Sequence, residues 1–309
     1  MTFLWAILSI AAAAFQTARN TLQRTLFAKV GTVGATHVRF MFGLPFALVF
    51  LFAVSIWLQV NNPSITVAGT LASRASTFWF ALAGGALFQI FATAFMLAAM
   101  EKQSFVVVTA FVKTEPLLVA LFGVLIIGDV LSLSAWVSIA LATLGVVMFS
   151  WPPKKLEAGS SELMAAIVPG LISASCFAFS VLGFRAAVLA LDVQAPFYVR
   201  AIIVLALGQT LQTACLSLWL RIREPGRLSS LFTAWRPSLV AGFFGASASG
   251  CWYMAFALES AAKVRTLGLI EIFFALIVSK QIFKQTITPL QLAGLLALAA
   301  GLGWLLIGA

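Results

Sequence analysis

Four polar side chains recur at helical spacing inside an otherwise apolar stretch near the N-terminus. They are Gln16, Arg19, Asn20 and Gln23, and the last three lie three, four and seven residues after the first. This spacing puts all four on one face of an α-helix. Such a stripe should face protein or water rather than lipid, so we expect it to line a cavity that binds a polar molecule. The alternative is that the helix ends near Ala18 and the four residues form a loop.

Two arginines, Arg39 and Arg200, lie near the starts of two further apolar stretches. Their planar guanidinium groups could bind a carboxylate or another anion. In the alternative interpretation they lie close enough to the helix ends to extend toward lipid headgroups. The sequence leaves both interpretations open.

Lys113 and Glu115 are two residues apart in another apolar stretch, so on a helix they point to different faces and need different partners. Glu271 could pair with Lys113 as a structural ion pair. In a sharper interpretation, Glu115 or Glu271 takes up a proton and couples its movement to other work. Pro116 removes one backbone hydrogen bond, and a kink there could act as a hinge.

Four other residues are candidates for contact with a bound molecule. Gln89 and Thr93 lie four residues apart, although packing through small neighbouring residues explains that helix face equally well. Trp252 and Tyr253 lie well inside an apolar stretch, where their rings could stack on a ligand or hold a cation. Packing against protein or lipid is the commoner fate of such rings.

The composition places these residues in a membrane. Hydrophobic residues make up 62% of the 309-residue chain and charged residues 9%, against about 25% charged in a soluble domain. The apolar runs approach 20 residues, which as a helix crosses about 30 Å of hydrocarbon. They are continuous rather than alternating, which favours helices over a barrel. The net charge of +10 therefore indicates loops that meet lipid headgroups rather than a nucleic-acid surface.

We predict an all-α integral membrane protein with ten transmembrane helices. Their expected ranges are 3–27, 34–57, 77–100, 104–127, 133–151, 163–184, 195–220, 236–258, 264–284 and 289–308. A linker at 154–162, rich in Lys, Gly and Ser, leaves a five-helix unit at 1–153 and another at 163–309.

The two five-helix units resemble each other. The segment 95–101 matches 253–259 at an offset of 158, with Met, Ala and Glu identical. Val38-Arg39 matches Val199-Arg200 at 161, and Gly145 matches Gly301 at 156. A unit with five crossings must place its second copy upside down in the membrane. Inverted repeats are typical of secondary transporters, which bind substrate near the midplane.

A family resemblance rests on several short motifs together with the five-plus-five arrangement. The motifs are Arg39-Phe40 with Pro45, Ala98-Ala99-Met100-Glu101, Glu115-Pro116-Leu117-Leu118, and Ile127-Gly128-Asp129-Val130-Leu131-Ser132 followed by Gly145. With these the chain resembles the drug/metabolite transporter superfamily, EamA type, over nearly its whole length. The resemblance implies a secondary transporter of the bacterial inner membrane, with a central cavity built from helices one to four and six to nine. The stretch 269–273 has no proline, unlike the family pattern, which argues against a symmetrical pair of proline hinges.

The side on which the termini lie is left open. Lys and Arg residues in loops after odd-numbered helices outnumber those after even-numbered helices, which are Arg74, Arg185, Lys263 and Arg265. The positive-inside rule then puts both termini outside. The family resemblance implies that both termini are cytoplasmic.

We therefore predict a secondary active transporter that works by alternating access around a central cavity and could be coupled to protons. The cations Arg19, Arg39, Lys113 and Arg200 favour small polar metabolites such as amino acids or other carboxylated or zwitterionic compounds. Export follows from the family resemblance. The expected partners are a small-molecule substrate and membrane lipids, not nucleic acid, and the chain is expected to be a monomer or a homodimer.

Two alternatives are an intramembrane enzyme that modifies lipids and a non-transporting membrane scaffold or channel. The enzyme would need a nucleophile with a base, or a metal cluster. The sequence has neither an H-E-x-x-H nor a G-x-S-x-G motif, and it has one histidine. A scaffold or channel would not require inverted repeats. We expect no enzymatic activity, no cofactor and no metal.

Overall fold

The structure, a computed structural model, describes residues 3–102, 105–151, 160–224, 226, 231–274, 276–277 and 288–308. Within these, it does not describe the side chains of residues 23–33, 35, 97–98, 101–102, 105–107, 109, 160–166, 231 and 233.

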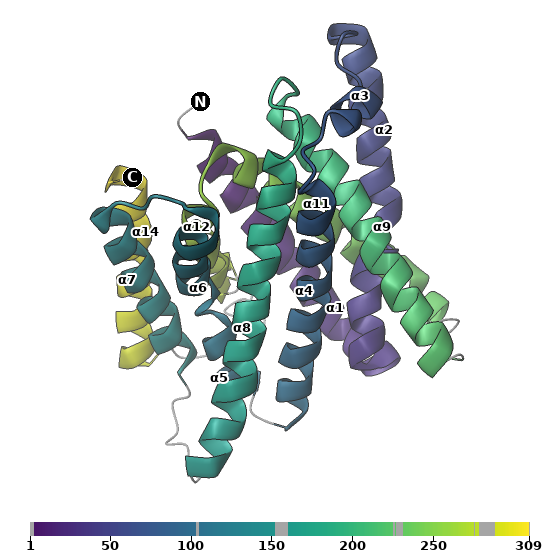
Figure 1. The fold of residues 1–309 in the computed structure, drawn as a ribbon. Coiled ribbons are helices and arrows are strands. Elements are labelled where there is room, and N and C mark those ends of the chain that lie inside the picture. Colours follow the sequence, from purple (N-terminus) through teal and green to yellow (C-terminus); the bar gives the residue numbers. More distant parts are fainter. Residues whose placement is uncertain are drawn as a thin grey trace. The chain divides into compact units, whose positions relative to one another are not determined.

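Every regular element in the described part of the chain is helical, which confirms the all-α prediction (Figure 1). The α-helices are α1 (Leu4–Met41), α2 (Leu44–Asn61), α3 (Val67–Ala72), α4 (Phe78–Lys102), α5 (Phe105–Val112), α6 (Glu115–Phe122), α7 (Leu133–Ser150), α8 (Ser160–Leu189), α9 (Phe197–Arg223), α11 (Trp235–Leu258), α12 (Ala261–Leu267) and α14 (Pro289–Gly308). Three short turns complete them, namely the π-helical η1 (Gly123–Ile127) and the 3-10 turns η2 (Leu231–Ala234) and η3 (Gly268–Ile270).

Eight helical segments of the described residues are long and apolar enough to cross a membrane. They are Thr36–Asn61, Phe78–Met96, Ala110–Ile127, Leu133–Ser150, Ile167–Leu189, Phe197–Arg223, Trp235–Leu258 and Pro289–Gly308. These correspond to the predicted helices two to eight and ten. The predicted first helix lies in α1, and the predicted ninth begins with α12 and η3 and runs into residues 278–287, which lie outside the described residues. The count of ten crossings stays a prediction.

The chain forms two compact units, each built from two separate segments. Unit 1 comprises Met1–Leu87 and Gly183–Glu259, and unit 2 comprises Phe88–Leu182 and Ser260–Ala309. Each unit therefore combines residues from both halves of the sequence. The predicted division into repeats at 1–153 and 163–309 concerns the sequence rather than these units, and it stays a prediction.

In unit 1, α1 changes direction along its length. Twenty residues of straight helix rise about 30 Å. However, a Cβ added to Gly245 of α11 would lie 3.3 Å from Cδ of Arg19 and 3.8 Å from Cγ of Arg39. Arg19 and Arg39 thus both approach Gly245 of α11, so the chain must turn back between residues 19 and 39. The sequence predicted a turn here between helices at 3–27 and 34–57. The turn is confirmed, but the loop expected to make it is wrong, because the backbone stays helical.

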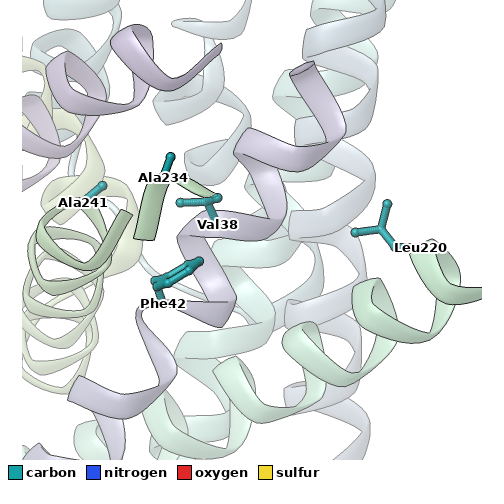
Figure 2. Close-up of a cluster of buried hydrophobic side chains, with 5 residues drawn as sticks. All are labelled: Val38, Phe42, Leu220, Ala234 and Ala241. Carbon is teal, nitrogen blue, oxygen red and sulfur yellow. The ribbon is translucent and has the colours of Figure 1, made fainter. Parts of the chain in front are cut away.

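A buried apolar cluster joins three helices of unit 1 (Figure 2). Val38 lies near the end of α1 and Phe42 directly follows that helix, while Leu220 comes from α9, Ala234 from η2 and Ala241 from α11. Burying these side chains fixes the end of α1 against α11. The cluster thereby sets the position of the backbone that carries Arg39.

In unit 2, α7 and α14 pack in antiparallel directions through glycines. A Cβ on Gly301 would lie 2.6 Å from the backbone nitrogen of Ala142, and one on Gly294 would lie 2.6 Å from the carbonyl oxygen of Gly145. Near the other end, Nε1 of Trp304 donates a hydrogen bond of 2.9 Å to Oγ of Ser134. Small residues allow such close backbone approach between membrane helices.

This packing predicts that the same substitution, glycine to alanine, has different effects on stability at two nearby positions of α14. Gly301→Ala should destabilise the protein by about 1–3 kcal/mol, because its Cβ would clash with α7 backbone that cannot move freely. Gly303→Ala is the matched control, since nothing lies within 4 Å of its Cβ position. Thermal unfolding of the two variants in detergent tests this, and equal melting temperatures would contradict the packing.

Candidate functional site

The predicted polar stripe of α1 meets α11 within unit 1. Nε1 of Trp252 donates a hydrogen bond of 3.2 Å to Oε1 of Gln16. These residues are 236 positions apart in the sequence, so the contact joins the first and second halves of the chain. Gln16 is half-buried, and Trp252 is buried at 5% exposure.

Arg19 is held in the same region by a neighbour on its own helix. Its Nε and Nη2 donate hydrogen bonds of 3.2 and 2.7 Å to Oδ1 of Asn20. Arg19 is only 6% exposed, whereas Asn20 is exposed. The stem of Arg39 approaches the same glycine of α11, Gly245, as the stem of Arg19. The structure therefore brings Gln16, Arg19 and Arg39 together on α11, with Asn20 beside them.

Of the other unit 1 candidates, Tyr253 lies close enough to Arg39 to interact with its charge. Arg200 lies in the first turn of α9, near a helix end, and no contact to the α1 stripe is observed for it among the described residues. The side chain of Gln23 lies outside the described residues. Tyr253 is buried at 6% exposure, and its ring centre is 4.8 Å from that of Phe184, which agrees with the core-packing alternative.

Two ion pairs lie within unit 2, and both join the first half of the sequence to the second. Lys113 pairs with Glu271, as the sequence predicted. Glu115 accepts two hydrogen bonds from Arg265, from Nε to Oε1 at 2.8 Å and from Nη2 to Oε2 at 2.7 Å. This two-point geometry is the strong form of an arginine–carboxylate contact. The Glu115 side chain is 7% exposed and that of Glu271 is 10% exposed.

The ion pairs sit beside interruptions in their helices. α5 ends at Val112 and α6 begins at Glu115, so the predicted helix at 104–127 breaks one turn before Pro116. Pro116 has no N–H to bond with Val112, which explains the break. The second interruption follows α12, where the 3-10 turn η3 replaces α-helical backbone just before Glu271. This interruption occurs without a proline.

The remaining candidates, Gln89 and Thr93, lie on α4 in unit 2. Thr93 is buried, and its hydroxyl donates a hydrogen bond of 2.8 Å to the carbonyl oxygen of Gln89. That bond satisfies the Thr93 hydroxyl within its own helix. It agrees with the packing alternative for this residue.

Two residues of these clusters were missed by the sequence analysis. Arg265 was assigned to a loop, and that assignment is wrong because Arg265 lies in α12 and binds Glu115. A signal was available, since an unpaired Glu115 in hydrocarbon requires a cation. Nothing in the spacing of Gly245 indicated that two arginines would meet there.

Apolar spanning helices with paired charges between them define a multi-pass integral membrane protein. Residues 3–151 match the sequence model of the EamA-like transporter family. This match confirms the resemblance over the first half of the chain, and the family implies a transporter of the drug/metabolite type. A crystal structure of another protein is similar in fold over 99% of this chain and 98% of that chain, with a TM-score of 0.68 and 12% sequence identity. No curated protein matches the sequence.

If Lys113 and Glu271 form an ion pair, reversing one charge should destabilise the protein and reversing both should restore much of the loss. Glu271→Lys alone places two cations together and should lower the free energy of unfolding by about 3 kcal/mol, at the low end for buried pairs because Lys113 is 24% exposed. Adding Lys113→Glu should restore much of the loss, because the pair re-forms in reverse. Melting temperatures of the single and double variants measure this coupling, and additive losses would argue against the pair.

Proposed function

We propose that the protein is a secondary active transporter that exports small carboxylated or zwitterionic metabolites by alternating access. The observation that carries this proposal is the buried Arg19, held with Gln16 and Asn20 on one face of a helix in a family of transporters. A buried guanidinium in the apolar part of a membrane protein is costly, so its presence indicates a functional site. Its fork of donors suits a carboxylate.

The distribution of charge supports an anionic group on the substrate. Unit 1 contains eleven of the 19 Lys and Arg residues but three of the nine Asp and Glu residues. The three are Asp192, between α8 and α9, and Glu224 and Glu259, at the C-terminal caps of α9 and α11. All three lie outside the helices, whereas Arg19 is buried and Arg39, Arg185 and Arg200 are half-buried. Among the described side chains, the interior of unit 1 therefore carries cations rather than carboxylates and would attract an anion.

The packing of α7 on α14 supports the inverted repeats that alternating access commonly uses. At the offset of 156 that relates Gly145 to Gly301, Ala142 corresponds to Leu298. A Cβ on Gly145 would meet Leu298, and one on Gly301 would meet Ala142. Exchanging the two repeats therefore converts the contact of Gly145 with Leu298 into the contact of Gly301 with Ala142. An exchange of this kind, between antiparallel helices, is expected of two copies related by an axis in the membrane plane.

Further parts of the proposal rest on the family and on the ion pairs. The family match ends at residue 151, close to the proposed boundary of the first repeat at 153. Lys113 and Glu271 correspond at an offset of 158, so their ion pair would lie on the axis between repeats. Glu115 and Glu271 are our candidates for proton coupling, and Pro116 for a hinge. We place the protein in the bacterial inner membrane, as a monomer or homodimer, with substrate and lipid as its partners.

The anion-binding role predicts a ranking among arginine variants. Arg19→Ala and Arg39→Ala should raise the KM for a carboxylated substrate by about tenfold to a hundredfold, the worth of a buried hydrogen bond to a charged group. Arg200→Ala should have a similar effect only if Arg200 also binds substrate. Arg74→Ala is the matched control, because Arg74 is exposed in the connection before α4. Uptake of labelled amino acids and carboxylates into proteoliposomes gives these values, and an unchanged KM for all variants would contradict the anion-binding role.

The coupling role predicts the effect of neutralising each carboxylate. Glu115→Gln and Glu271→Gln keep the side-chain shape but cannot carry a proton. If either residue couples transport to protons, its Gln variant should lose uphill transport driven by a pH gradient while keeping exchange of substrate across the membrane. Proton-driven transport that persists in both variants, with its pH dependence intact, would remove these carboxylates from the coupling.

A further inference from the structure

A second set of polar side chains in unit 1 lies where α9 packs against the end of α1. Oγ of Ser217 lies 3.0 Å from Nε2 of His37, and the two form a hydrogen bond. Further along the chain, Gly43 approaches the Gln209 amide, because a Cβ on Gly43 would lie 3.2 Å from Oε1 of Gln209. These two contacts mark the ends of an interface between α9 and residues 37–43, which we name the α9 seam.

Thr213 lies between these two contacts on α9. Gln209, Thr213 and Ser217 follow one another at four-residue intervals, which places them on one face of the helix. A threonine inside a helix often satisfies its hydroxyl within that helix, as Thr210 does by donating to the carbonyl oxygen of Ala206 at 2.7 Å. The buried Thr213 hydroxyl makes no such bond with any described residue. It must therefore be satisfied in the seam.

Three buried polar atoms of the α9 seam have no hydrogen-bond partner among the residues that the structure describes. They are Nδ1 of His37, Oγ1 of Thr213 and Oε1 of Gln209. His37 is fully buried and Gln209 is 4% exposed. Polar groups in such places are costly when unsatisfied, and in native proteins most of them have a partner. Three of them along one seam indicate that another molecule bonds there.

The three atoms limit the chemistry of that molecule. Oε1 of Gln209 can only accept a hydrogen bond, the Thr213 hydroxyl can donate and accept, and Nδ1 of His37 does one or the other according to its tautomer. A carboxylate has no proton to donate to Gln209. A buried ammonium would need a compensating negative charge, and the three carboxylates of unit 1 lie outside its helices. A neutral O–H group both donates and accepts, so it suits all three atoms.

We propose that the α9 seam binds neutral O–H groups, which complete the hydrogen bonds of His37, Thr213 and Gln209. Water and a hydroxyl group of a transported molecule are the two sources of this chemistry, and only the second source rests on the proposed function. The seam ends beside the backbone of Arg39, because the Cβ position of Gly43 is also 2.7 Å from the Arg39 carbonyl oxygen. It therefore adjoins the region where we place the substrate.

The first test asks whether the seam holds water, and it needs no substrate. Thr213→Val keeps the side-chain shape but removes the hydroxyl. Thr210→Val is the matched control on the same helix, because the Thr210 hydroxyl is satisfied by its own backbone. If water is bound, the melting temperature of purified Thr213→Val should lie about 2–4 °C below that of the control, the equivalent of one hydrogen bond. In a dry seam the substitution removes an unsatisfied hydroxyl, so Thr213→Val should melt at or above the control temperature.

The second test asks whether a substrate hydroxyl enters the seam. Lactate differs from propionate by one hydroxyl group, and malate differs from succinate in the same way. Uptake into proteoliposomes gives the KM of each compound. If the seam takes the hydroxyl, the wild type should prefer the hydroxylated acid of a pair. Thr213→Val and Gln209→Met should then reduce that preference about fivefold, the worth of one neutral hydrogen bond, and Thr210→Val should keep it.

The two measurements separate the sources and show when the inference fails. A lower melting temperature with an unchanged preference assigns the O–H group to water, and a reduced preference assigns it to the substrate. If Thr213→Val matches Thr210→Val in both measurements, the inference is overturned. If the wild type transports no carboxylated or zwitterionic compound, the proposed function fails, and the melting temperatures alone then decide whether the α9 seam binds O–H groups.

Discussion

A charge inside hydrocarbon must be neutralised or solvated by other groups, and this constraint organises both units of the protein. In unit 2 the constraint is met by ion pairs that join distant parts of the sequence, Lys113 with Glu271 and Glu115 with Arg265. In unit 1 the buried Arg19 donates two hydrogen bonds to the amide oxygen of its neighbour Asn20. The same physical requirement is thus met by carboxylates in one unit and includes an uncharged amide in the other.

The constraint also explains which contacts could be predicted from the sequence. Lys113 and Glu271 were matched because both lie inside apolar stretches, at corresponding positions of a repeat, with opposite charges. Arg265 was missed because its place near the start of a helix looked like a loop, although the need of Glu115 for a cation was visible. The spacing of Gln16, Arg19 and Asn20 correctly predicted a helical face, because helical periodicity is a local property. Their meeting with Trp252 and Gly245 depends on packing between distant helices, which periodicity does not encode.

The backbone was predictable to a similar degree. Hydrophobic length located the spanning helices, and Pro116 located the break between α5 and α6. The interruption at η3 was not predicted, because no proline marks it and a 3-10 turn leaves no clear sequence signal. The turn of α1 between Arg19 and Arg39 was expected, but its helical backbone was not.

The contrast between the units supports a division of roles in transport. A bidentate pair such as Glu115–Arg265 has most of its hydrogen-bonding capacity filled, so it has little left for a substrate and is better suited to holding interrupted helices in one arrangement. Breaking such a pair is costly, so a conformational change that opened it would need compensation from a proton or another charge. In unit 1 the buried Arg19 donates to the uncharged amide of Asn20. On the proposed function, a substrate anion would bring negative charge to a unit that holds eleven Lys and Arg residues and three Asp and Glu residues. The ion pairs of unit 2 would then hold the interrupted helices in one arrangement.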